Sequence, residues 1–148
     1  MKPKILILED SIERINWIKS IFDDHADIQW KDNVADFLQL VEVIPENELA
    51  CLIFDHDLPL GCDTTNEPVY IQNNLNDSND QNGYDAACLL PYRNVPCLIW
   101  SVNPRGRDRI EAALKDKGMV GKQISFLSVH YPALVDWLTK VIVPWHRK

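Results

Sequence analysis

Cys51 to Asp55 (CLIFD) places four consecutive apolar side chains directly before a carboxylate. Ile5 to Glu9 (ILILE) repeats this arrangement, and Cys97 to Ser101 (CLIWS) ends in a hydroxyl group instead. A short continuous apolar run, rather than an alternating one, is typical of a central parallel strand that is covered on both faces. The three runs therefore predict the middle of a parallel β-sheet with a polar group at the end of each strand.

Two further runs, Ile28 to Lys31 and Gln123 to Ser128, predict two more strands, and the alternating pattern of the first suits an edge position. Between the strands, apolar residues recur three and four positions apart, as on the buried face of an amphipathic helix. Five segments have this spacing: 12–22, 34–41, 86–90, 110–118 and 134–142. Strict alternation with right-handed crossovers predicts an α/β fold, with a five-stranded parallel sheet in the order 2-1-3-4-5 between two layers of helices.

The first predicted helix has a start signal in its sequence. Asp10 stands three residues before Glu13, the spacing of a capping box. We therefore expect Asp10 to cap this helix, which is also the ordinary structural explanation for acidic residues at this position.

The length of 148 residues is that of one domain, and we interpret residues 1–148 as a single domain. One connection is unusually long: residues 61–82 are rich in Asn and Asp and have neither helical nor strand periodicity. We interpret them as a polar lid or an insertion after the third strand. A calcium-binding loop is disfavoured, because its central glycine and terminal glutamate are missing.

The chain has 22 acidic and 15 basic residues and a formal net charge of -7. Such a charge repels nucleic acid and argues against general DNA binding. The four cysteines form no C-x-x-C pair, which favours reduced thiols. The N-terminal apolar run is too short for a signal peptide or a membrane span. We therefore expect a cytoplasmic protein with no membrane partner.

Polar residues gather where the predicted strands end. In an open parallel sheet the ligand site lies outside the carboxyl ends of the strands, where the strand order reverses. Carboxylates brought together there repel one another unless they take up protons or hold a cation. Because Mg²⁺ and similar hard ions prefer carboxylate and phosphate oxygens, we expect Mg²⁺, or Mn²⁺, at this edge. The residues that follow the strands are Glu9 and Asp10, then Asp55, His56 and Asp57, then Ser101 and Asn103, and finally His130.

The third strand offers the strongest candidate for a ligand or nucleophile. Side chains alternate along a strand, so Asp55 and Asp57 share one side and His56 points away. A buried strand seldom ends in two acids that have no partner, which favours Asp55 as a functional residue.

A basic segment follows the fourth strand. A helix start near Gly106, flanked by Arg105 and Arg107, offers backbone N–H and guanidinium groups to an anion. Ser101 and Asn103 precede it, and we expect these four polar side chains to hold a phosphate. The alternative is a solvated helix surface, where arginines are common.

The order in which these acidic and hydroxyl residues follow the predicted strands resembles that of the receiver domain of two-component response regulators, and the resemblance covers nearly the whole chain. The receiver's acidic pair corresponds to Glu9 and Asp10, its phospho-accepting aspartate to Asp55, and its strand-4 Ser/Thr to Ser101. Gly83 corresponds to the glycine that opens the third helix. The resemblance implies the CheY-like, or flavodoxin-like, (βα)5 fold. It also implies Mg²⁺ on the three carboxylates and in-line transfer of a phosphoryl group to Asp55.

The chain departs from the receiver pattern in three places. His130 stands where a lysine before a proline is expected, residues 61–82 expand the loop after Pro59, and no output domain is expected beyond Lys148. These departures put the ordinary signalling role in question.

Two short strings are closer to an offshoot of the superfamily. Asp55 to Leu58 (DHDL) and Ser101 to Gly106 (SVNPRG) resemble the cyclic-phosphate-processing receiver-like domains. That family is inferred to consist of metal-dependent enzymes that act on cyclic phosphate ends of nucleotides or RNA.

Three functions follow from these resemblances. The first is a metal-dependent phosphoesterase whose partner is a phosphorylated small molecule or an RNA end. The second is a stand-alone receiver phosphorylated on Asp55 by a histidine kinase or another phosphodonor, and the third is a degenerate receiver that only binds a protein. In the phosphoesterase, the metal lies on Glu9, Asp10 and Asp55, the catalytic candidates are Asp55, Asp57, His56, His130 and Ser101, and phosphate is held by Ser101, Asn103, Arg105 and Arg107.

Overall fold

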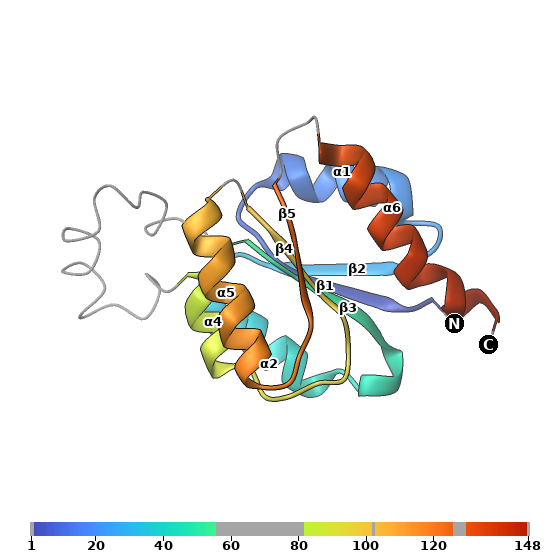
Figure 1. Ribbon diagram of the computed structural model, residues 1–148. Helices are drawn as coiled ribbons and strands as arrows, with labels where there is room; N and C mark the ends of the chain where they lie inside the picture. Colours follow the sequence, from blue (N-terminus) through green and yellow to red (C-terminus); the bar gives the residue numbers. More distant parts are fainter. Residues whose placement is uncertain (1, 56–81, 102, 126–129, 148) are drawn as a thin grey trace.

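The computed structural model describes residues 2–55, 82–101, 103–125 and 130–147, which form a parallel β-sheet between two layers of helices (Figure 1). All neighbouring strands run parallel, in the order β2-β1-β3-β4-β5. This confirms the predicted strand order, with β2 at an edge. The strands are β1 (Lys4–Leu8), β2 (Asp27–Lys31), β3 (Leu49–Phe54), β4 (Cys97–Trp100) and β5 (Gly121–Ile124).

The α-helices divide between the two faces of the sheet (Figure 1). One face is covered by α1 (Ile12–Phe22) and α6 (Tyr131–Ile142), and the other by α2 (Val34–Val43), α4 (Gly83–Leu89) and α5 (Pro104–Asp116). The crossover through α1 moves one way across the sheet and the later crossovers move the other way, so right-handedness places them on opposite faces. Two 3₁₀ helices complete the described elements: η1 (Glu46–Glu48) before β3 and η5 (Val143–Arg147) after α6.

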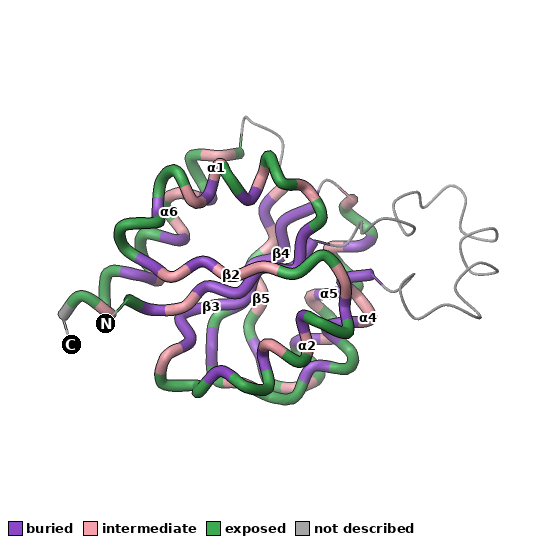
Figure 2. The backbone as a smooth tube through the Cα atoms, turned by 180° about the vertical axis from the view of Figure 1, so that it is seen from behind, coloured by how far each residue is buried: buried purple, intermediate pink, exposed green. Residues whose placement is uncertain are grey.

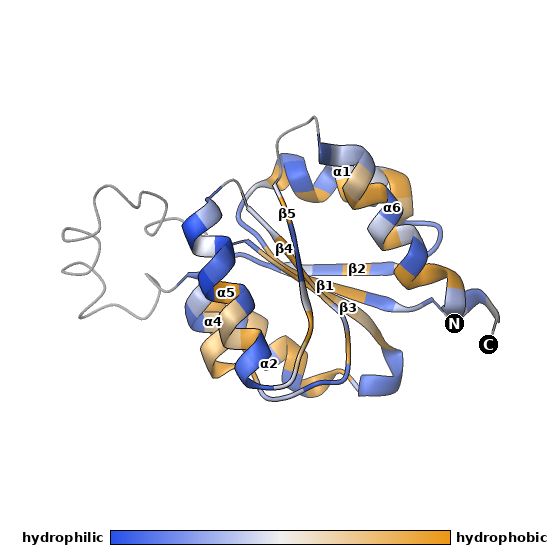
Figure 3. Ribbon diagram, in the orientation of Figure 1, coloured by the Kyte–Doolittle hydropathy of each residue, from blue (hydrophilic) through white to orange (hydrophobic). Residues whose placement is uncertain are grey.

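Both faces of the central strands are buried, which explains their continuous apolar sequences. Leu6 and Leu8 of β1 pack into the cluster beneath α2, α4 and α5, whereas Ile5 and Ile7 pack beneath α1 and α6. Successive side chains of a strand point to opposite faces, so a strand between two helical layers needs apolar residues at every position. Figure 2 shows the buried strands in the middle of the molecule, and Figure 3 shows the hydrophobic residues concentrated there.

The starts of two helices refine the expectations from sequence. Ser11, and not Asp10, caps α1: its Oγ accepts a hydrogen bond from the backbone N–H of Arg14 at 3.3 Å. The predicted cap was wrong by one residue, because α1 begins only at Ile12 and Asp10 stays beside Glu9 after the end of β1. The predicted start of α4 at Gly83 is confirmed, and a capping box formed by Asn82 and Asp85 precedes it.

Several predicted features fall on parts of the chain that the structure does not describe. These are residues 61–81 of the predicted insertion, together with His56 and Asp57. The last residue of that insertion, Asn82, belongs to α4 as its N-cap.

Among the described cysteines, Cys51, Cys88 and Cys97 are free thiols. Burial raises the pKa of Cys97 to about 12 and raises the pKa of Cys51 as well. The two buried thiols therefore pack as small apolar side chains. None of the described helices is long and apolar enough to cross a membrane.

Candidate metal and phosphoryl site

Two acidic residues continue the central strands at the carboxyl edge of the sheet. Glu9 follows β1 and Asp55 follows β3, and these strands are neighbours in which Leu8 lies opposite Phe54. The sheet hydrogen bonding extends past both strand ends. The backbone N–H of Asp55 donates to the carbonyl of Leu8 at 3.0 Å, and that of Glu9 donates to the carbonyl of Lys31 at 3.0 Å. The two carboxylates are therefore held side by side by regular backbone structure.

Glu9, Asp10 and Asp55 each offer one carboxylate oxygen, and these three oxygens lie within 4.8 Å of one another. Glu9 is 0% exposed and Asp55 is 1% exposed, whereas Asp10 reaches the surface. Opposite oxygens of a Mg²⁺ octahedron are about 4 Å apart, given Mg–O distances of about 2.1 Å. The three oxygens are therefore close enough for a small divalent cation to draw them into one coordination sphere by small side-chain movements, and Asp10 opens this group to solvent.

Arg14 lies among these carboxylates, and the sequence interpretation missed it. Its Nε donates to Oε1 of Glu9 and its Nη2 donates to Oε2 of Glu9 at 3.0 Å, a bidentate pair. The same Nη2 lies 3.5 Å from Oδ2 of Asp55 and 3.8 Å from Oδ1 of Asp10. The only signal in the sequence was the i,i+4 spacing of Asp10 and Arg14, which is common on helix surfaces.

The environment moves the pKa values of the two acids after β1 in opposite directions. Burial raises the pKa of Glu9, but the hydrogen bond from Arg14, a hydrogen bond with Asp55 and the charge of Arg14 together outweigh it. The pKa of Glu9 therefore lies below its ordinary value. The pKa of Asp10 is raised, first by partial burial and then by the neighbouring charge of Glu9. The lowered pKa favours the ionised form of Glu9, whereas the neighbouring negative charge makes ionisation of Asp10 less favourable.

Ser101 follows β4 at the same edge of the sheet. It is buried, and its Oγ accepts a hydrogen bond from the backbone N–H of Asn103 at 3.1 Å. Because β4 is the neighbour of β3, with Ile99 opposite Phe54, the hydroxyl group follows the strand next to that of Asp55. The hydroxyl group of Ser101 therefore lies at the end of β4, next to the end of β3 that carries the buried carboxylate of Asp55.

Asn103 and Arg107, which were predicted to hold phosphate, each have structural partners in the described part of the chain. Asn103 is the N-cap of α5, and its Oδ1 accepts from the backbone N–H of Gly106 at 3.0 Å. Arg107 donates to the carbonyl of Ser101 and to Oε1 of Gln123, the latter at 3.2 Å. Arg105 is exposed at the start of α5. Arg107 therefore connects β4 to β5, and Arg105 is the more accessible of the two arginines.

His130 is exposed at the N-terminus of α6, directly before an aromatic group that lies under this end of the helix. The ring of Tyr131 lies 4.3 Å from that of Trp17 and 6.3 Å from that of Trp100, measured between centroids. Trp100 is fully buried and immediately precedes Ser101. These aromatic side chains connect α1, β4 and α6 next to the acidic site.

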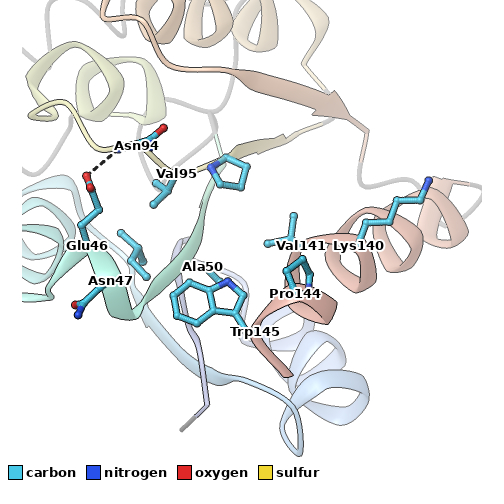
Figure 4. Close-up of a pocket in the computed structure, with 11 residues that line it drawn as sticks. Glu46, Asn47, Ala50, Asn94, Val95, Lys140, Val141, Pro144 and Trp145 are labelled. Carbon is cyan, nitrogen blue, oxygen red and sulfur yellow. Dashed lines mark hydrogen bonds between the residues drawn. The ribbon is translucent and has the colours of Figure 1, made fainter. Parts of the chain in front are cut away.

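A cavity of about 500 Å³ lies elsewhere, at the amino ends of the strands (Figure 4). Ala50 at the start of β3, Val95 before β4, and Pro144 and Trp145 of η5 line it. The backbone N–H of Asn94 donates to Oε1 of Glu46 at its rim, at 2.9 Å. None of the predicted site residues that the structure describes lines this cavity, which lies at the opposite end of the strands from Glu9 and Asp55.

Comparison with solved structures identifies the fold. The chemotaxis response regulator CheY4 of Vibrio cholerae matches 95% of this chain and 99% of its own, with 13% identity and a TM-score of 0.62. The match with the receiver domain of the Francisella response regulator 1452 covers 99% of this chain and 98% of that domain, with 15% identity and a TM-score of 0.61. The match with the BeF3-activated receiver domain of DrrB covers 95% of this chain and 97% of that domain, with 13% identity and a TM-score of 0.58. No protein-family model and no curated protein matches the sequence.

The chain thus has the fold of a CheY-like response-regulator receiver domain, as the resemblance of its sequence implied. An acidic group of the kind that binds a divalent metal in receivers lies at the ends of β1 and β3. The structural likeness establishes the fold, but at identities of 13 to 15% it establishes the fold alone, so the function has to be argued from the site.

Proposed function

We propose that this protein is a receiver that binds a divalent cation at Glu9, Asp10 and Asp55 and accepts a phosphoryl group on Asp55. The observation that carries the proposal is the position of Asp55. It is a buried carboxylate at the end of a central strand, beside two further carboxylates whose oxygens lie within 4.8 Å. Arg14 brings one positive charge to three clustered carboxylates, two of which are buried, so the arrangement favours a further cation and with it a functional role.

The chemistry assigns a separate task to each described side chain. One oxygen of Asp55 forms a bond to phosphorus while the bond from phosphorus to the leaving atom of the donor breaks; this atom is an imidazole nitrogen in a phosphohistidine and an oxygen in an acyl phosphate. With acetyl phosphate as the donor, acetate is released and Asp55 becomes an acyl phosphate. Ser101 provides a hydroxyl group that can donate a hydrogen bond to a phosphoryl oxygen. A bound divalent cation would neutralise charge on the phosphoryl oxygens.

The phosphodonor we propose is a histidine kinase or a small acyl phosphate. The receiver fold supports this partner class, and the depth of Asp55 requires a donor that can present its phosphoryl group at the open side of the site near Asp10. Hydrolysis of cyclic phosphates is the alternative, and it rests on the DHDL and SVNPRG strings.

The two functions are separated by treating the protein with Mg²⁺ and acetyl phosphate, and separately with Mg²⁺ and a 2',3'-cyclic nucleotide. The expected result is one added phosphoryl group by intact mass, absent in Asp55→Asn and retained in Asp24→Asn, an exposed aspartate just after α1. The cyclic nucleotide should stay intact. Opening of the cyclic phosphate without formation of an acyl phosphate would replace the proposal by the phosphoesterase function. If neither reaction takes place, the result favours a module that only binds a protein.

A further inference from the structure

The acidic site already contains a cation supplied by the chain itself. The Nη2 atom of Arg14 lies within 4 Å of one oxygen of each of the three carboxylates: 3.0 Å from Glu9, 3.5 Å from Asp55 and 3.8 Å from Asp10. The guanidinium group is held by the bidentate pair with Glu9, whose side chain is 0% exposed. Arg14 is therefore positioned between the acids and does not lie along the outer surface of α1.

A guanidinium nitrogen and a metal ion make incompatible demands on these oxygens. The nitrogen takes hydrogen-bond distances of about 2.7–3.2 Å, whereas a Mg²⁺ ion draws its oxygens in to about 2.1 Å. The space that Nη2 takes between Asp10 and Asp55 is the space that the three carboxylates offer to an ion. Two cations in contact also repel each other, and the surrounding burial strengthens this repulsion.

We propose that Arg14 is a built-in counter-ion that competes with the divalent cation, so that metal binding requires its guanidinium group to leave Asp10 and Asp55. This inference rests on the metal site of the proposed function. Arg14 keeps the buried acids paired while the site holds no metal, and it sets the concentration of metal at which the site fills.

The side chain has room for this movement. Arg14 lies in the first turn of α1 and its side chain is 23% exposed, so one edge of the guanidinium group already faces solvent. The contacts with Asp55 and Asp10 are longer than the hydrogen bonds to Glu9. Rotation about the terminal bonds of the side chain moves Nη2 away from all three carboxylates and leaves the hydrogen bond from Nε to Oε1 of Glu9 as the pivot.

The test is a direct measurement of metal binding, with no enzymatic or phosphorylation readout. Calorimetric titrations with Mg²⁺ and with Mn²⁺ are carried out on the wild type, Arg14→Met, Arg14→Lys and Arg93→Met. Arg93 lies in the loop before β4, at the opposite end of the sheet, and controls for the loss of one positive charge. Circular dichroism establishes that each variant is folded.

We expect Arg14→Met to bind Mg²⁺ at least tenfold more tightly than the wild type, and Arg93→Met to bind as the wild type does. Arg14→Lys, which keeps the charge and loses the bidentate geometry, should lie between them. If Arg14→Met does not fold without metal, tighter binding by Arg14→Lys decides the question. Unchanged or weaker binding in both Arg14 variants, with normal binding by the wild type, overturns the role of Arg14 alone. Absence of binding in all four proteins refutes the metal site and the proposed function with it.

Discussion

Replacing Arg14 by methionine should destabilise the metal-free protein by about 2–3 kcal/mol, because it removes the counter-ion of a buried acidic pair. Methionine matches the aliphatic part of the arginine side chain and lacks the guanidinium group, so the packing of α1 is disturbed little. The loss therefore reports mainly on the charge and hydrogen bonds of the guanidinium group.

The magnitude follows from the burial of the partners. The side chains of Glu9 and Asp55 are 0% and 2% exposed, and removing one partner of a fully buried ion pair costs about 3–5 kcal/mol. Two features reduce this figure. Arg14 is 23% exposed, so water can replace part of the guanidinium group. The backbone N–H of Asp10 still donates to Oε2 of Glu9 at 3.0 Å.

The assay is urea unfolding at neutral pH in the presence of EDTA, supported by thermal melts. For a chain of this length, 1 kcal/mol corresponds to about 2–4 °C, so a melting temperature about 4–12 °C lower is expected. Arg93→Met should stay within about 0.5 kcal/mol of the wild type, as surface substitutions do. Saturating Mg²⁺ should reduce the difference between Arg14→Met and the wild type. A loss in EDTA no larger than that of Arg93→Met would refute the view that Arg14 stabilises the buried acids.

Three further substitutions test separate parts of the structure. The pKa of Glu9 is lowered on folding, so its contribution to stability is present above the ordinary value of 4.5 and is lost as the pH falls through the folded-state pKa; Glu9→Gln should flatten this part of the pH profile of urea midpoints, and an unchanged slope would contradict it. Asn103→Ala removes the cap of α5 and should cost about 1 kcal/mol in urea unfolding, whereas no loss would show that the cap is dispensable. Gly121→Ala places a Cβ 3.0 Å from Cδ1 of Ile99 and should cost about 1–3 kcal/mol by the same measurement; an unchanged free energy of unfolding would show that the core accommodates the methyl group.

The order of the sheet could be predicted because strands and helices alternate along the chain with right-handed crossovers, and because apolar residues at every position mark the central strands. Burial on both faces makes the strands of the sheet centre apolar at each position, as in Cys51 to Phe54, and the spacing of apolar residues in the intervening segments marks one buried face of each helix. The proximity of Glu9 and Asp55 could also be predicted, because they follow neighbouring parallel strands, which end at the same edge of the sheet.

The partners of individual polar side chains could not be predicted in this way. Asp10 was expected to cap α1, yet Ser11 does so, and the difference is a single residue in where the chain turns into the helix. That Arg107 binds a phosphate stays a prediction, whereas its hydrogen bonds to the carbonyl of Ser101 and to Gln123, sixteen positions away in the sequence, could be found only in the structure.

Arg14 shows most clearly where sequence reasoning ends. Its spacing from Asp10 is that of an ordinary surface ion pair on a helix, and no periodicity distinguishes it from Glu13 or Lys19. Only the packing of α1 against the ends of β1 and β3 turns its side chain toward Glu9 and Asp55. The pattern of apolar residues predicts which faces are buried, because the residue type at each position indicates whether that position faces the core. Which charges meet at the sheet edge depends on distances between residues far apart in the chain, and these are set when the layers pack.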